Sequence, residues 1–158
     1  MAKYDDASWH YEGDFPPELP KENGGTHIGL FLAWCMHNNL LSAFLLEESG
    51  EDINRVLNKE MTGRDFLFKW CDGKLTDEDL NEIGNDFAGD YYDETGKFAE
   101  TTASYLQDFS VAAEIYSREF KLDFASSYHI EDSWEFFEVF RVLLDNRFLQ
   151  WKAFRKNL

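Results

Sequence analysis

The longest hydrophobic stretch of the chain lies at residues 27–38, where almost every position of a helix would be apolar. A helix that is apolar on all sides is typical of the centre of a core. Thr26 is a suitable N-cap, and the polar run at 37–39 closes the stretch because asparagine tolerates the turn that ends a helix. The pattern therefore predicts a buried central helix at 27–38, with these side chains inaccessible: Phe31, Leu32, Trp34 and Cys35.

Hydrophobic residues at three- and four-residue intervals predict further helices around this central one. The predicted helices lie at residues 40–48, 51–59, 62–71, 76–91, 102–118 and 133–156. Thr62, Thr76 and Ser133 are the side chains best placed to cap the starts of three of them. Residues 120–124 alternate like a short strand, but no partner strand is evident, so we assign them to a loop or a helix continuation.

Residues 4–20 lack a helical period and contain three prolines, which favour extended backbone. We expect residues 1–25 to form an extended arm packed on the bundle. The arm either displays His10 beside Asp5 and Asp6 for a function or serves only as a strap, and we favour the strap. The predicted fold is all-α, a single domain over residues 1–158 with about six irregularly packed helices and this arm.

Composition adds little to the fold but constrains the location of the protein. The two cysteines, Cys35 and Cys71, lie in apolar helical patterns and cannot form a disulfide framework, which indicates a reducing cytoplasm. Residues 26–46 are interrupted by histidine and asparagine, whereas a membrane span needs about 20 largely apolar residues. We expect a cytoplasmic protein that does not enter a membrane; the sequence does not determine its oligomeric state.

The formal net charge of −16 is the strongest compositional feature. Residues 1–140 hold thirty acidic and ten basic side chains, whereas residues 141–158 hold one acidic and five basic ones. Such a field repels nucleic acid and attracts basic proteins. On a helix from residue 76, one arc would be apolar (Leu80, Ile83, Phe87, Tyr91). The neighbouring arc would form an acidic ridge, which we predict to be the partner-binding surface: Asp79, Glu82, Asp86, Asp90 and Asp93.

The patterns that would indicate catalysis or a cofactor are missing from the sequence. No nucleophile elbow or dinucleotide fingerprint occurs, so we expect no cofactor and no catalytic residue. The histidines and cysteines never fall in a paired ligand spacing, so we expect no metal site. One alternative stays open: a small-ligand-binding protein or enzyme with a pocket between the arm and the central helix. Its lining would be Trp9, His10, His27 and Trp34.

Several short motifs occur together: Tyr-Asp-Asp-Ala-Ser-Trp-His-Tyr at 4–11, Gly-Asp-Phe-Pro at 13–16, Thr-His-Ile-Gly at 26–29, and Phe31 with Ala33-Trp34. With them, the chain resembles a family of small, acidic, uncharacterised bacterial proteins. Proteins of this kind are similar to the immunity partners of bacterial toxins. The resemblance implies a binding protein, not an enzyme, that neutralises a cognate toxin by occluding its active site. The acidic ridge would then face a basic cleft of the toxin.

Overall fold

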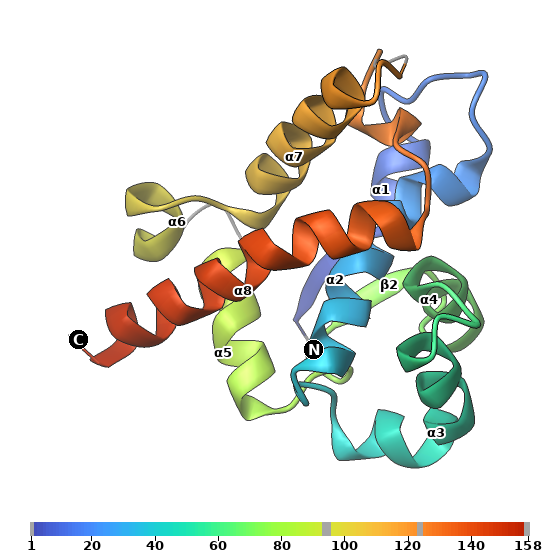
Figure 1. Cartoon of the computed structure of the whole chain (residues 1–158). Coiled ribbons are helices and arrows are strands. Elements are labelled where there is room, and N and C mark those ends of the chain that lie inside the picture. The colour runs from blue at the N-terminus through green and yellow to red at the C-terminus, as the bar shows by residue number, and fades with distance from the viewer. Residues whose placement is uncertain (1, 93–95, 123–124, 157–158) are drawn as a thin grey trace.

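The computed structural model describes residues 2–92, 96–122 and 125–156, and within them the chain is mostly helical (Figure 1). The helices surround α2 (Thr26–His37), and the strands form a single two-stranded sheet. The predicted all-α class is therefore confirmed, with a small sheet added. The remaining helices are α1 (Ala7–Tyr11), α3 (Ala43–Leu57), α4 (Gly63–Trp70), α5 (Glu82–Tyr91), α6 (Lys97–Thr101), α7 (Tyr105–Glu119) and α8 (Trp134–Lys156), with 3-10 turns at Lys21–Gly25 and Ser127–His129.

Helix α2 is the centre of the core, as its apolar pattern predicts. Phe31, Leu32, Trp34 and Cys35 are each 0 % exposed. The helix begins one residue earlier than expected, because Thr26 is its first residue and Gly25 its N-cap. The long helix α8 crosses it in Figure 1, and the indole of Trp34 donates to Asp145 of α8 over 2.9 Å.

Two glycines allow α2 and α4 to touch backbone to backbone. A Cβ atom added to Gly63 would overlap the carbonyl group of Gly29, and one added to Gly29 would overlap the backbone at Arg64. Only glycine permits this separation, because every other residue carries the atom that would collide. The side chains around the contact therefore pack at a distance that is fixed by the main chain.

The predicted helices are found with some changes of boundary. Thr62 and Ser133 cap α4 and α8 as predicted, accepting from the backbone N–H of Asp65 and Phe136. The two helices expected at 40–48 and 51–59 are one helix, α3, with a kink at Ser49. The Ser49 hydroxyl donates to the carbonyl of Leu45, which stabilises the kink without ending the helix.

The N-terminal arm is not wholly extended, which corrects the prediction for residues 1–25. Residues 3–6 form strand β1 (Lys3–Asp6), which pairs antiparallel with β2 (Lys74–Thr76). Helix α1 follows at once, because the side chain of Asp6 accepts from the N–H of Ser8 and caps it. A helix of five residues is too short to show a hydrophobic period, and the strand pairs with residues far along the chain.

The helix predicted to begin at Thr76 begins at Glu82 instead. Thr76 ends β2, and the segment after it turns back so that the Asp79 carboxylate accepts from the N–H of Thr76. Asn81 then caps α5 through the N–H of Gly84. Ile83, predicted to face the core, is 53 % exposed, because the projection assumed a helix continuous from residue 76.

Substitution of Gly63 tests the backbone contact between α2 and α4. We expect Gly63→Ala to lower the free energy of unfolding in urea by about 3 kcal/mol, because the added methyl group meets main-chain atoms that cannot move aside. Gly89→Ala is the matched control, since nothing lies within 4 Å of its added Cβ. The control is expected to raise the free energy by about 0.5–1 kcal/mol. A loss below about 1 kcal/mol for Gly63→Ala would contradict the close contact.

Candidate functional site

Three polar side chains converge where the N-terminal arm meets the central helix. Asp5 comes from β1, His10 from α1 and His27 from the first turn of α2. A Cβ on Gly24 would lie 3.0 Å from the carbonyl oxygen of Ala7, so glycine there lets the turn before α2 pack closely against α1. This close approach brings His27 beside His10. We call these three residues the Asp5–His10–His27 cluster.

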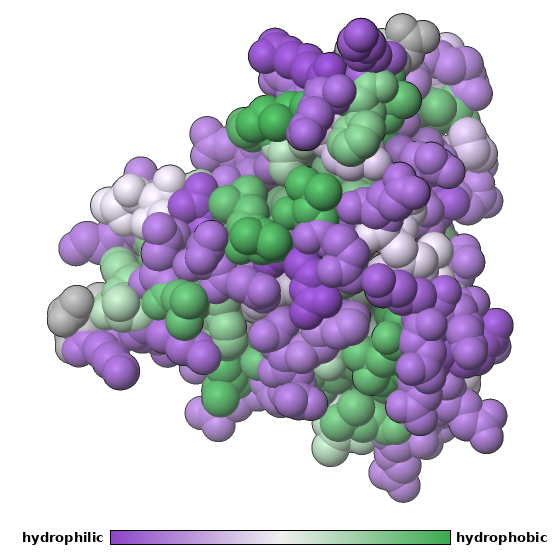
Figure 2. Space-filling model, viewed as in Figure 1, coloured by the Kyte–Doolittle hydropathy of each residue, from purple (hydrophilic) through white to green (hydrophobic). Residues whose placement is uncertain are grey.

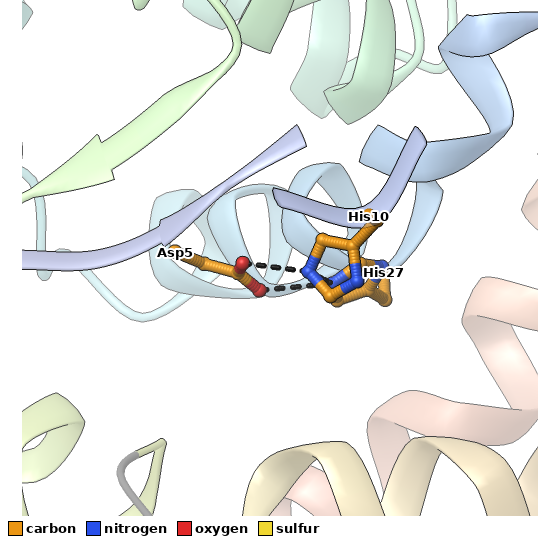
Figure 3. A group of neighbouring side chains, drawn as sticks. All are labelled: Asp5, His10 and His27. Atoms are coloured by element: carbon orange, nitrogen blue, oxygen red, sulfur yellow. Dashed lines mark hydrogen bonds and ion pairs between the residues drawn. The ribbon is translucent and has the colours of Figure 1, made fainter. Parts of the chain in front are cut away.

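The three side chains point toward one another, as Figure 3 shows. His10 Nε2 lies 2.7 Å from Asp5 Oδ1, and His27 Nε2 lies 2.9 Å from Asp5 Oδ2. The two Nε2 atoms are 3.1 Å apart. Asp5 and His27 have only 3 % of their side-chain surface exposed, and His10 has 16 %. The cluster is thus a compact, nearly buried arrangement reached from the side of His10.

Tyrosine hydroxyls surround the cluster and fix its orientation. Tyr92 donates to Asp5 Oδ2 over 2.6 Å, and the hydroxyl of Tyr128 lies 2.8 Å from His10 Nδ1. Tyr105 donates to the backbone carbonyl of His27 over 2.6 Å. These contacts come from the end of α5, the turn near residue 128 and the start of α7, so much of the fold takes part in placing the three side chains.

The surroundings determine the charges of the cluster. Burial by itself would raise the pKa of Asp5, but the hydrogen bonds from His10 and His27 outweigh it and hold that pKa well below its usual range. Burial lowers the pKa of His27, against the opposing effect of Asp5. Asp5 is therefore an ionised carboxylate, and His27 favours the neutral imidazole at neutral pH.

A small cavity of about 110 Å³ opens beside the two imidazoles. Its lining combines hydroxyl groups with apolar side chains: His10, His27, Leu106, Phe109, Ser110, Ser127 and Tyr128. Leu106 and Ser110 also border a wider surface hollow of about 560 Å³. Small polar molecules and ions can therefore approach the imidazoles from the α7 side.

Two of the four residues predicted to line a pocket do line this cavity. His10 and His27 are in the cluster, but Trp9 is 55 % exposed and Trp34 lies in the core, bonded to Asp145. The carboxylate beside His10 is Asp5, whereas Asp6 caps α1. A pocket between the arm and α2 thus exists on the α7 side, without either tryptophan in its lining.

The predicted acidic ridge is not a continuous surface of free carboxylates. Asp79 lies before α5 and its carboxylate is engaged in a turn, while Asp86 and Asp90 form ion pairs with Arg155 of α8. Asp90 also accepts from the indole of Trp151 over 2.8 Å. Glu82 is exposed, and Asp93 lies outside the described residues. The basic C-terminal helix neutralises the middle of the ridge.

Sequence reasoning assessed metal ligands along single elements and so missed this convergence. Each of the three residues offers one ligand atom, and these atoms all lie within 4.8 Å of one another. The other candidates are dispersed: His37 packs on Phe137 and His129 lies beside Glu18. The signal in the sequence was the combination of Asp5, His10 and His27 in the motifs of the arm and the central helix, although no spacing rule links them.

Replacement of the Asp5 carboxylate tests its role in the cluster. In chelator-treated protein, we expect Asp5→Asn to lower the free energy of unfolding by about 3 kcal/mol, because an amide cannot accept all the donors that surround this position. Asp65→Asn, an exposed control, is expected to change it by under about 1 kcal/mol.

The pH dependence provides a second check on Asp5. A carboxylate with a lowered folded-state pKa stabilises the fold above the unfolded value of about 4 and loses that effect as the pH falls further. Urea titrations should therefore show the difference between wild type and Asp5→Asn shrinking below about pH 4. An equal difference at pH 3 and pH 7 would contradict the lowered pKa.

Comparisons with known proteins place the chain in a family but not with a characterised relative. Residues 3–121 match the model of a family described as Domain of unknown function (DUF7832), a range that includes the whole cluster. No curated protein and no solved structure matches the chain. Among the residues that the structure describes, none of the helices has both the length and the apolar character that a bilayer crossing requires. The expected kinship with uncharacterised proteins is confirmed: the chain belongs to the DUF7832 family of domains of unknown function.

Proposed function

We propose that this protein is an immunity-type binding protein that neutralises a basic cognate toxin by covering the active site of the toxin. The proposal is supported by the resemblance of the sequence motifs to such proteins and by the net charge of −16. A strongly acidic surface accelerates association with a basic cleft and disfavours neutral or acidic partners. Nucleic acid is disfavoured as a partner for the same reason.

Three of the five basic residues of α8 form ion pairs with carboxylates of the same molecule. Arg147 contacts Asp108 through two nitrogen atoms at 2.8 and 3.1 Å, and Arg155 contacts Asp86 and Asp90. Arg141 pairs with Glu138. Asp86 and Asp90 are therefore already paired within the molecule, and a different acidic surface has carboxylates that are unpaired within the described part of the chain.

That surface is an acidic hollow of about 490 Å³ at the kink of α3. Glu47, Glu48 and Glu51 line it and are exposed, and none of them forms an ion pair among the described residues. Trp70 lies in its wall and is 38 % exposed. This group of free carboxylates around an aromatic ring is the observation that carries the proposal.

Exposed hydrophobic residues also occur on the half of α3 that carries Glu47 and Glu48. Phe44 is 68 % exposed and Leu46 is 50 % exposed, and both lie on the same half of α3. Protein interfaces combine an aromatic or apolar anchor with a charged rim, and the anchor supplies most of the binding energy. The hollow lies at the kink of α3, because Ser49 and the residues on both sides of it are part of its lining.

A second candidate function is favoured by a different observation. The cavity beside His10 and His27 supports the alternative of a small-ligand-binding protein or an enzyme, since pockets with a few convergent polar groups are typical of such sites. An active-site role would require substrate turnover, whereas an immunity protein needs only to bind.

Coexpression distinguishes the two functions. The product of a toxin gene adjacent to the gene of this chain is expected to arrest growth when expressed alone, and this chain is expected to restore growth. Restoration without direct binding of the purified proteins would favour the enzyme, and no restoration would contradict the immunity function.

Charge reversal in the acidic hollow tests the proposed surface. We expect Glu47→Lys with Glu51→Lys to slow association with the toxin about tenfold or more in stopped-flow measurements, because a complementary contact becomes repulsive. The control is Glu78→Lys with Glu82→Lys, which makes the same change in net charge at exposed positions elsewhere.

The two double variants weaken long-range attraction equally, so a difference between them reports the contact surface. If the Glu78/Glu82 variant slows association more, the binding surface lies around Glu82, which belongs to the ridge predicted from the sequence. Equal, small effects in both variants would contradict an acidic interface. Circular dichroism of each variant checks that the fold is intact.

A further inference from the structure

We propose that Asp5, His10 and His27 form a binding site for a divalent transition-metal ion, with Zn²⁺ as the best match to the donor set. This inference does not depend on a protein partner and stands whether or not the protein is an immunity protein. It rests on the spacing of three ligand atoms, on the groups that orient them and on the cavity beside them.

The spacing of the ligand atoms fits a single ion. His10 Nε2 lies 2.7 Å from Asp5 Oδ1, His27 Nε2 lies 2.9 Å from Asp5 Oδ2, and the two Nε2 atoms are 3.1 Å apart. Ligand atoms held about 2.1 Å from one tetrahedral ion are about 3.4 Å apart, so the side chains need to separate by only a few tenths of an ångström to admit it. Two imidazole nitrogens and a carboxylate are also the donors that Zn²⁺ and its neighbours in the first transition row prefer.

The hydrogen bonds to Asp5 do not by themselves account for how near the two Nε2 atoms lie to each other. If both Nε2 atoms carried protons for Asp5, two N–H groups would face each other with their nitrogens 3.1 Å apart. If each Nε2 instead presents its lone pair, an ion between them turns this close approach into two coordination bonds. The mutual orientation of the rings, seen in Figure 3, follows directly from shared ligation.

The groups around the cluster match the supporting contacts of metal sites. A ligating histidine normally donates its other N–H to an oxygen, and the Tyr128 hydroxyl lies 2.8 Å from His10 Nδ1. The ligating carboxylate is itself usually hydrogen-bonded, and Asp5 accepts from Tyr92 and from the backbone N–H of Asp6. Tyr128 and Tyr92 are thus positioning residues for the ligands.

The electrostatic conditions also favour a cation. A carboxylate and two imidazoles are donors that suit a divalent cation, and the carboxylate brings negative charge to the site. The overall charge of −16 raises the local concentration of cations further.

The cavity determines what kind of metal site this would be. Structural zinc sites are closed by four protein ligands, whereas catalytic sites have three and keep a position for water or substrate. Here three protein ligands border a cavity of about 110 Å³, which has room for about three or four water molecules or a small ligand. The hydroxyls of Ser110 and Ser127 line the same cavity and can hydrogen-bond a group on the ion.

Metal titration of the full chain tests the proposal. We expect chelator-treated protein to bind one Zn²⁺ per chain in calorimetry, with a dissociation constant in the micromolar range or below, and to show a higher unfolding temperature with the ion. His10→Gln is expected to weaken binding at least about 100-fold. His129→Gln is the control at a partly buried histidine that lies outside the cluster, beside Glu18, and it is expected to bind as wild type does.

A second variant tests the same site in case the His10→Gln substitution disturbs the fold. Tyr128→Phe retains the ring and removes only the hydroxyl beside His10, so it should fold normally and bind Zn²⁺ about tenfold more weakly. The visible absorption of bound Co²⁺ should change in this variant, which a purely structural role of the hydroxyl would not cause. Lack of stoichiometric Zn²⁺ binding, or equal binding by wild type, His10→Gln and Tyr128→Phe, would overturn the proposal.

Discussion

The backbone contact between Gly29 and Gly63 is the constraint on which the rest of the structure depends. It sets α4 directly against one side of α2, so the remaining elements must cover the other sides of a helix that has no polar face. At 100° per residue, His27 and Gly29 point in nearly opposite directions. The side of α2 opposite the glycine contact is therefore the side that receives the N-terminal arm. The tight contact with α4 and the polar cluster thus both follow from the placement of Gly29 and His27 on opposite sides of α2.

Asp5 fixes the position of the N-terminal arm, as the glycine contact fixes the position of α4. Its two oxygen atoms accept from the two histidines, Tyr92 and the N–H of Asp6, which joins β1, α1, α2 and the end of α5 through one carboxylate. A buried carboxylate is costly unless its oxygen atoms have hydrogen-bond partners, and here each of the two has a partner. On the face shown in Figure 2, hydrophobic residues form separate patches among hydrophilic ones.

Sequence patterns predicted the elements whose signals are local. The apolar run at 27–38 gave α2, and the caps at Thr62 and Ser133 gave the starts of α4 and α8. The β1–β2 pair, the Asp5–His10–His27 cluster and the partners of the ridge were missed because each joins segments that are far apart in the chain or belong to different elements. Asp90 and Arg155 are an example: their charges were evident, but their pairing depends on how α8 crosses the bundle. The ridge is interrupted at Asp79 because the helical projection continued a period through the turn that Asp79 closes.

The pairing of Lys3 with Thr76 has a consequence for the order of folding. Helices such as α4 and α8 depend on local contacts and can form early, whereas joining segments so distant in the chain requires a large loop to close first. We therefore expect the arm to reach its final position after the segment up to Tyr92 has assembled around α2. The three polar side chains come together in that final step, so a chain that stalls before it would retain most of its helices and yet lack the cluster.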